Sequence, residues 1–317
     1  MTAFVVVNPR SGNGRTKRDW PKIRARLETL FPLMTVAESR ERGETAQLVR
    51  AALHEGHLDI IAVGGDGTIN EAINGFFENG APVSPDAVFG FIASGQDGDF
   101  RRTFGIKPGY EAGVARLRLA RIRKLDVGYV SCLSPRGEPV GRYFVNVASF
   151  GLSGRIAARL GRARLSRLFG GAFSHAFNTM MALTGWHAPR VRLIAPEIKG
   201  GAKAYDEIAG ITAVAVANGR WFAGGMKVAP AAEPGDGLFD IVVLGGAPRR
   251  RILGEIGAVR EGMHLADPSV RVIRTARLMA APTVDTHGAV AVETDGESVG
   301  LLPATFEIVP GAINLRC

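Results

Sequence analysis

Short apolar runs alternate with helical patterns over about the first 126 residues. The apolar runs lie at 4–7, 59–63 and 88–93, and the helical patterns at about 20–30, at 45–54 and directly after the second run. Strands that alternate with helices are typical of a parallel sheet with helices on both faces. The pattern therefore predicts an α/β domain with a parallel sheet over residues 1–126.

The pattern changes near residue 127. From there on, strand-like runs are separated by turns, at 143–150, 190–195, 211–219, 238–244, 289–302 and 304–315. Such a series is typical of antiparallel strands. We expect a mainly antiparallel β-rich domain over 127–317, with a helical segment inserted at about 155–185. The last segment of the chain could return to the first domain.

The composition fits two globular domains and indicates the kind of partner and the cellular compartment. The chain has 317 residues and a formal charge of +9, which favours an anionic partner such as a nucleotide, a nucleic acid or an anionic membrane surface. Two cysteines, Cys132 and Cys317, are too few for a disulfide framework or a cysteine metal site, so a reducing cytoplasm fits best. The first residues lack the pattern of a signal peptide.

Arginines and apolar residues interleave over 155–168, and the following stretch 168–189 carries no Asp, Glu, Lys or Arg. A basic amphipathic helix can rest on an anionic lipid surface, but the same spacing also fits a solvated arginine face over an ordinary core. The uncharged stretch is long enough to cross a bilayer, yet its polar residues and glycines make it a poor transmembrane helix. We interpret it as a buried or membrane-resting segment.

Three loops follow predicted strands and carry candidate chemistry, at 8–14, 64–68 and 93–100. Ligands of α/β domains bind at the carboxyl ends of strands, where glycines let the backbone approach a phosphate. Thr68 and Glu71 have capping-box spacing, and a helix N-terminus beside a glycine loop is an anion site. Asp97 and Asp99 could join Asp66 in holding Mg²⁺.

Five sequence blocks, in the same order over nearly the whole chain, resemble the catalytic family of diacylglycerol kinases. This family includes bacterial lipid kinases, sphingosine kinases and ceramide kinases. The blocks are VVVNPRSGNGR, VGGDGTINEAINGF, YFVNVASFGL, VANGRWFAGGMKVAPAAEPGDGLFDIVVL and TDGESVGLLPATFEIVPGAINL. The resemblance implies an α/β nucleotide-binding domain of the NAD kinase and diacylglycerol kinase type, followed by a β-sandwich-like domain.

The resemblance also implies a lipid kinase that transfers the γ-phosphate of ATP with the help of Mg²⁺. The residues that would bind the nucleotide are Asn8, Ser11, Gly12, Ser39, Gly64, Gly65, Asp66, Gly67, Thr68, Glu71 and Gln96. Asp66 and Asp99 would be magnesium ligands. A local interpretation makes Asp295-Gly296 a hairpin turn, whereas the resemblance assigns Asp295, with Glu297 beside it, to the catalytic group that accepts the lipid hydroxyl proton.

A second ion, Mg²⁺ or Ca²⁺, is implied at the matching Asp236 and at backbone carbonyls of Glu233 and Leu238, with Asp126 linked to them. The alternative is a glycine turn without a metal. At 93–100 the chain departs from the usual family pattern, because Gln96 replaces a threonine and Gly98 an asparagine. An aspartate close after the glycine resembles the ceramide kinase branch and favours a ceramide or sphingoid acceptor over diacylglycerol.

We therefore expect a cytoplasmic lipid kinase, peripheral on the inner membrane face, with ATP, a membrane lipid and an anionic membrane surface as partners. No nucleic-acid partner is expected, and a homodimer is compatible with the resemblance. Two rivals remain. A soluble kinase of the NAD kinase type shares the glycine loop, and a non-catalytic lipid-binding relative would bind lipid independently of ATP.

Overall fold

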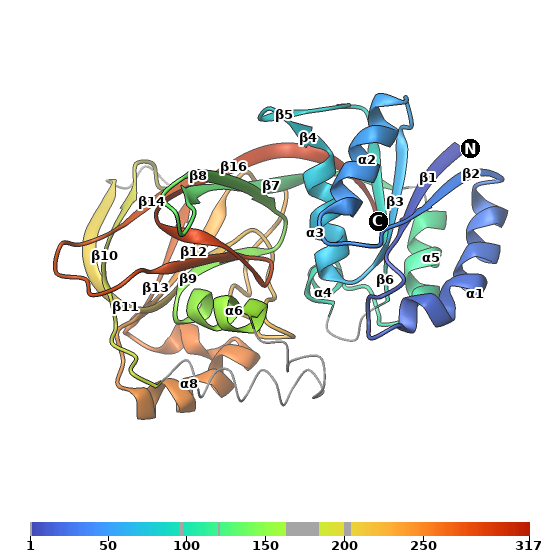
Figure 1. Ribbon diagram of the computed structural model, residues 1–317. Helices are drawn as coiled ribbons and strands as arrows, with labels where there is room; N and C mark the ends of the chain where they lie inside the picture. The colour runs from blue at the N-terminus through green and yellow to red at the C-terminus, as the bar shows by residue number, and fades with distance from the viewer. Residues whose placement is uncertain (1, 95–97, 120, 163–183, 200–203) are drawn as a thin grey trace.

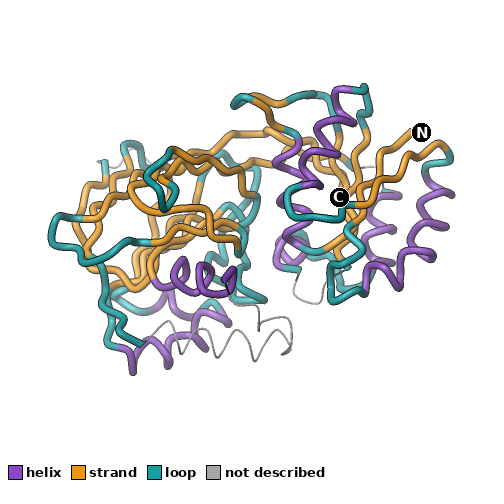
Figure 2. Tube along the Cα trace, viewed as in Figure 1, coloured by secondary structure: helices purple, strands orange, loops and turns teal. Residues whose placement is uncertain are grey.

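The computed structural model describes residues 2–94, 98–119, 121–162, 184–199 and 204–317. Helices flank the strands of the N-terminal half, whereas strands make up most of the C-terminal half (Figure 1, Figure 2). The mixed α/β architecture agrees with the predicted fold class.

Four strands of the N-terminal half pair in parallel in the order β2-β1-β3-β6. Val5 and Val7 of β1 pack with residues of α1 and α5, whereas Phe4 and Val6 pack with residues of α2 and α3, so helices cover both faces. The elements of this half are β1 (Thr2–Val7), α1 (Arg15–Leu30), β2 (Leu33–Glu38), α2 (Glu44–His54), β3 (Asp59–Gly64), α3 (Asp66–Gly75), β4 (Phe77–Glu78), β5 (Ala81–Pro82), β6 (Val88–Ala93), α4 (Asp99–Thr103) and α5 (Tyr110–Arg118).

Two features of this half differ from the sequence-based expectation. Strand β2 was not predicted, because it lies at the edge of the sheet and its residues are only partly buried. Helix α1 begins at Arg15 rather than near residue 20, directly after Gly14, whose φ of 82° is readily adopted only by glycine. Its first turn is polar, so apolar periodicity did not reveal it.

The C-terminal half is built from antiparallel pairs in the order β13-β12-β11-β10-β14-β16. Its core contains the rings of Phe144, Phe150, Phe239 and Phe306. The elements are β7 (Ile122–Leu133), β8 (Pro139–Phe144), β9 (Val147–Gly151), α6 (Leu152–Arg162), β10 (Arg190–Ala195), β11 (Tyr205–Ala217), β12 (Phe239–Gly245), α8 (Arg249–Glu261), η2 (Met263–Ala266), β13 (Val270–Thr275), β14 (Arg277–Pro282), β15 (Ala291–Thr294) and β16 (Glu297–Arg316).

Strand β16 joins the two halves, as its long red arc in Figure 1 shows. Its end pairs with β6 in parallel, at Asn314 with Val88 and at Leu315 with Phe89, while earlier residues pair with β7, β14 and β15. Leu315 is fully buried at this junction. The last segment of the chain thus returns to the N-terminal half, as the sequence analysis allowed. The parallel strands are part of one mixed sheet, in which β16 covers the edge that β6 would otherwise expose.

Helix α6 contains the beginning of the predicted basic amphipathic segment. Arg155 donates a hydrogen bond to the Thr184 carbonyl and lies over the ring of Trp186. Residues 163–183 lie outside the described part of the chain, so most of the uncharged stretch does too. Among the described helices, none is long and apolar enough to span a bilayer.

Candidate active site

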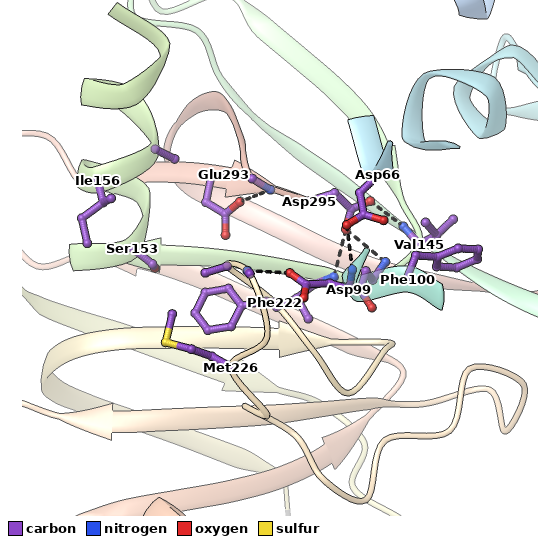
Figure 3. A pocket seen from close by; sticks show the side chains of 16 residues that line it. Asp66, Asp99, Phe100, Val145, Ser153, Ile156, Phe222, Met226, Glu293 and Asp295 are labelled. Carbon is purple, nitrogen blue, oxygen red and sulfur yellow. Dashed lines mark hydrogen bonds between the residues drawn. The ribbon is translucent and has the colours of Figure 1, made fainter. Parts of the chain in front are cut away.

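Two cavities share a wall, because residues from the same two segments, 65–68 and 293–297, line both of them. The polar cavity has a volume of about 300 Å³ and is lined by Asn8, Arg10, Ser11, Ser39, Arg40, Glu41, Arg42, Gly65, Gly67, Thr68, Glu71 and Glu297. The acidic cavity has a volume of about 260 Å³, and four carboxylates line it, those of Asp66, Asp99, Glu293 and Asp295 (Figure 3). Both segments of the wall contribute residues to both cavities.

The polar cavity gathers most of the predicted nucleotide-binding residues from three loops that leave strands. Asn8 Nδ2 donates to Thr68 Oγ1 at 3.1 Å, which ties the first loop to the glycine loop. The Ser11 hydroxyl contacts the Asn8 carbonyl at 2.9 Å, and Ser39 is buried after β2. Gly12 has a φ of 60° within the first loop but does not line the cavity.

Gly64 has a structural role beside this cavity. A Cβ atom at Gly64 would lie 2.4 Å from Thr68 Oγ1, so only glycine allows α3 to begin this close to β3. At Gly65, the nearest atom to an added Cβ is Ser11 Cβ at 4.0 Å, so this position is open toward the cavity. Of the two glycines, only Gly65 lines the space that a ligand could fill.

The predicted capping box is wrong. Helix α3 begins at Asp66 with Gly65 as its N-cap, so Thr68 already lies within the helix and caps nothing. Glu71 instead accepts a hydrogen bond from the Gly43 amide at 2.9 Å, which fixes the start of α2 beside the cavity. Gly65, Gly67 and Thr68 at the N-terminus of α3 still line the polar cavity, so the first amides of the helix lie beside it.

Sequence reasoning missed a chain of ion pairs that crosses from one half of the molecule to the other. Glu297 Oε2 accepts from Arg42 at 2.9 Å and from Arg142 at 2.7 Å. Arg142 also donates to Asn70 Oδ1 at 2.9 Å. The run Arg-Glu-Arg after Ser39 was the available signal for Arg40 and Arg42, but no local pattern marks Arg142 as a partner of Glu297.

Asp295 is held at the turn between β15 and β16, so the hairpin interpretation is correct locally. Its φ is 48°, and its carboxylate accepts four hydrogen bonds, from Asn70 Nδ2 at 2.7 Å and from the amides of Val145, Asn146 and Val147 at 3.0 Å each. Burial raises the pKa of Asp295, while these N–H donors act in the opposite direction. Asn70 and Asn146 were not among the predicted site residues.

Asp66 and Asp99, the predicted magnesium ligands, both line the acidic cavity. Asp66 Oδ2 accepts the Asp99 amide at 2.7 Å, and Asp99 Oδ2 accepts the Gly224 amide at 2.8 Å. Burial, and next the charge of Asp99, raise the pKa of Asp66 to about 7. Asp66 Oδ1 is buried without a hydrogen-bond partner among the described residues. Gln96 lies outside the described residues.

The second predicted ion site has a different environment. Both oxygens of Asp126 already accept backbone amides, from Gly237 and Gly311 at 2.7 Å each. The Asp236 carboxylate forms an ion pair with Arg274 and accepts the Leu238 amide. Glu233 contributes its carbonyl to the turn, where the Gly235 amide donates to it at 2.8 Å. These contacts hold the turn together and leave acceptor positions on the Asp126 carboxylate unused, so the second ion remains a prediction.

Within the part of the chain that the structure describes, no three His, Cys, Asp or Glu side chains are close enough to form a metal-binding group of their own. Asp66 and Asp99 supply only two carboxylates. A Mg²⁺ ion usually retains waters and binds through one or two carboxylates together with substrate phosphates. This pair therefore fits a magnesium ion that arrives with a nucleotide.

The fold and the site together define a two-domain phosphotransferase, with a glycine-lined polar cavity next to a cavity of carboxylates. Comparison with known proteins agrees. Residues 2–130 match the diacylglycerol kinase catalytic domain, and residues 146–317 match the YegS C-terminal NAD kinase beta sandwich-like domain. The chain therefore belongs to the diacylglycerol kinase family of lipid kinases, in the form that carries a YegS-type C-terminal domain.

Individual relatives resemble the chain over most of its length. A diacylglycerol kinase of Bacillus subtilis (strain 168) is 27% identical over 306 residues, which cover 96% of this chain and 92% of the relative. A probable lipid kinase YegS-like of Pseudomonas syringae pv. syringae (strain B728a) is 27% identical over 87% of this chain and 81% of its own. The crystal structure of a diacylglycerol kinase from Bacillus anthracis str. Sterne has a TM-score of 0.67 at 20% identity and covers 99% of this chain and 96% of the other. That structure supports the fold alone.

Proposed function

We propose that this protein transfers the γ-phosphate of ATP to a hydroxyl group of a membrane lipid. The observation that carries the proposal is the shared wall between the cavities. In the first segment, Asp66 lines the acidic cavity, whereas the polar cavity is lined by Gly65, Gly67 and Thr68. In the second segment, Asp295 lines the acidic cavity and Glu297 lines the polar cavity. Because neighbouring residues line both cavities, two substrates bound in them would lie close together, and a direct transfer requires that their reacting atoms come into contact.

In this proposal the polar cavity binds the triphosphate. Its glycines allow the backbone amides to approach phosphate oxygens, and the N-terminus of α3 adds a favourable dipole. Arg10, Arg40 and Arg42 line the same space and can neutralise the phosphate charge. Asp66 and Asp99 would hold a Mg²⁺ ion, which supplies charge neutralisation on the transferred phosphoryl group when it is bound.

The acidic cavity receives the lipid hydroxyl, and an apolar space continues from it. Four residues line both the acidic cavity and a neighbouring cavity of about 140 Å³, namely Ser153, Ile156, Phe222 and Met226. The walls of the latter, between β11, β12, α6 and α8, are mostly apolar, and include Val214, Leu244, Ile252 and Val259. A hydrocarbon chain fits this path, whereas the polar nucleoside acceptor of an NAD kinase does not.

Asp295 is the proposed acceptor of the hydroxyl proton. Burial raises its pKa toward the range in which a carboxylate accepts a proton more readily, and it lines the acidic cavity where the hydroxyl would lie. Because four N–H donors fill its acceptor positions in the absence of substrate, the hydroxyl would have to displace one of them, and Asn70 Nδ2 is the one side-chain donor among the four. Asp66 is the second candidate, because its Oδ1 accepts no hydrogen bond among the described residues. Nucleotide binding distinguishes the two candidates, because loss of Asp66 would also weaken the binding of magnesium and nucleotide, whereas loss of Asp295 would not.

The direct test is transfer of labelled γ-phosphate from ATP in mixed micelles that contain diacylglycerol, ceramide, sphingosine, monoacylglycerol or no lipid, with NAD as a further acceptor. We expect label on a lipid with the wild-type protein and none with Asp295→Asn. Label on NAD alone would establish the NAD kinase rival. Lipid binding without any transfer would establish a non-catalytic relative.

A further inference from the structure

Glu293 is a buried carboxylate of the acidic cavity to which neither the phosphoryl transfer nor magnesium binding assigns a role. Only 2% of its surface is exposed to solvent, yet it lines the cavity beside Asp295 (Figure 3). It lies on β15, two residues before Asp295, on the same side of the wall. A carboxylate is seldom buried unless something compensates its charge.

The compensation present in the protein is incomplete. Glu293 Oε1 accepts the Ser149 hydroxyl, and Oε2 accepts the Gly296 amide at 2.8 Å. An ionised carboxylate offers about four acceptor positions, so these two bonds leave capacity that faces the cavity. The groups of the described residues that act on its charge are the Ser149 hydroxyl, the Gly296 amide and the nearby Asp295 carboxylate, with no cation among them.

Resting on the function proposed above, we infer that Glu293 is a specificity-determining residue, which selects lipid acceptors that carry a second hydrogen-bond donor. This donor is an N–H or O–H group one or two carbon atoms away from the carbon that carries the phosphorylated hydroxyl. The reacting hydroxyl lies at Asp295 and the second donor reaches Glu293. Ser153 stands on the same edge of the cavity, where its hydroxyl bonds to Ser149 at 2.7 Å.

The chemistry separates two groups of acceptors. An amide N–H or a further hydroxyl, as in sphingoid lipids or monoacylglycerol, donates to the free positions of the carboxylate. The ester oxygens of diacylglycerol can only accept hydrogen bonds. They would leave the buried Glu293 carboxylate without a donor and would place two hydrogen-bond acceptors next to each other. Sites built around a polar partner discriminate strongly against analogues that lack it, because the buried group is then left unsatisfied.

The first experiment compares kcat/KM for ceramide, monoacylglycerol and diacylglycerol in mixed micelles, for wild type and for Glu293→Gln. It is run at a pH well above 7, because burial raises the pKa of Glu293 to about 7 and the carboxylate must be ionised. We expect wild type to prefer the donor-bearing acceptors at least tenfold. We expect the ratio to fall at least tenfold in Glu293→Gln, with the KM for ATP unchanged, because the neutral amide can also donate to an ester carbonyl. A purely structural role would lower all three rates together and leave the ratio unchanged, which would overturn the inference.

A second arm needs no mutant and therefore does not depend on how the variant folds. Wild-type protein is given ceramide and analogues in which the amide is N-methylated and the second hydroxyl is replaced by hydrogen. Removing both donors should lower kcat/KM at least tenfold. Equal rates, or a wild-type preference for diacylglycerol, would contradict the inference while leaving the lipid kinase intact. Absence of transfer to every lipid would instead refute the proposed function, and the inference with it.

Discussion

The polar and the acidic cavity share a wall but differ in what they offer to a ligand. Glycine backbone, three arginines and three glutamates line the polar cavity, and of these Glu297 pairs with Arg42 and Glu71 accepts the Gly43 amide. The glycine amides and the arginines can receive an anion there, whereas four carboxylates and apolar side chains line the acidic cavity. Neighbouring residues of the same two short segments line the two cavities. One turn, between β15 and β16, and the start of one helix, α3, can therefore line the binding sites of two chemically different substrates.

Asp295→Asn should produce the largest effect, a loss of kcat, and should leave ATP binding in the polar cavity unchanged. Removing a proton acceptor typically lowers kcat by about 10²- to 10⁴-fold. The affinity for ATP, measured by titration of the nucleotide, should stay within about twofold, because the Asp295 carboxylate faces the acidic cavity. A parallel loss of ATP affinity would contradict the division of the two cavities.

Glu293 should make the stability of the protein depend on pH. Burial raises the pKa of Glu293 to about 7, above its ordinary value, so the folded protein binds this proton more tightly than the unfolded chain. Its contribution to stability is therefore fully present below about pH 4.5 and is lost as the pH rises through about 7, by about 3 kcal/mol in total. Urea unfolding at several pH values should show wild type losing stability relative to Glu293→Gln over this range. A flat difference would mean that Glu293 is solvated.

The adjacent glycines offer a matched pair on the polar side. Gly64→Ala should lower the free energy of unfolding by about 1–3 kcal/mol, because its Cβ would overlap Thr68. Gly65→Ala has room for its Cβ and should fold normally, but it should weaken ATP binding by projecting a methyl group into the cavity. Thermal unfolding and nucleotide titration distinguish the two. Equal effects on stability would show that the loop tolerates no side chain at either position.

Arg42→Met should have the smallest effect and sharpen the comparison. An exposed cation beside a phosphate contributes about 1 kcal/mol, so the dissociation constant for ATP should rise about fivefold, and the KM for lipid should not change. Arg24→Met is the control, because Arg24 pairs with Glu28 on the exposed face of α1 and lines neither cavity. A rise in the lipid KM for Arg42→Met would place this arginine on the wrong side of the wall.

Much of the site could be predicted because it lies in short contiguous motifs. Gly64 to Thr68 follow a buried strand and begin a helix, and Asp295 sits at a hairpin turn, so local pattern and resemblance marked both. The capping box failed because spacing alone does not determine where a helix begins. The helix started two residues before Thr68, which left Glu71 free to bind the Gly43 amide.

The residues that sequence reasoning missed depend on contacts between distant segments. Glu297 joins Arg42 and Arg142, which lie 255 and 155 residues away, and no local pattern connects the three. Glu293 resembles any polar residue of an alternating strand, and only the packing of β9, β16 and α6 around it shows that it is buried. Strand β16 likewise reaches β6 only in the folded chain.

A crystal structure with a non-hydrolysable ATP analogue and Mg²⁺ tests the central claim most directly, because it locates the nucleotide relative to the shared wall. The account predicts that the triphosphate fills the polar cavity beside Gly65, Gly67 and Thr68, with its terminal phosphate at the side of the wall where Asp66 lies. The acidic cavity should remain free for a second substrate. A nucleotide bound in the acidic cavity, or away from both, would contradict the account.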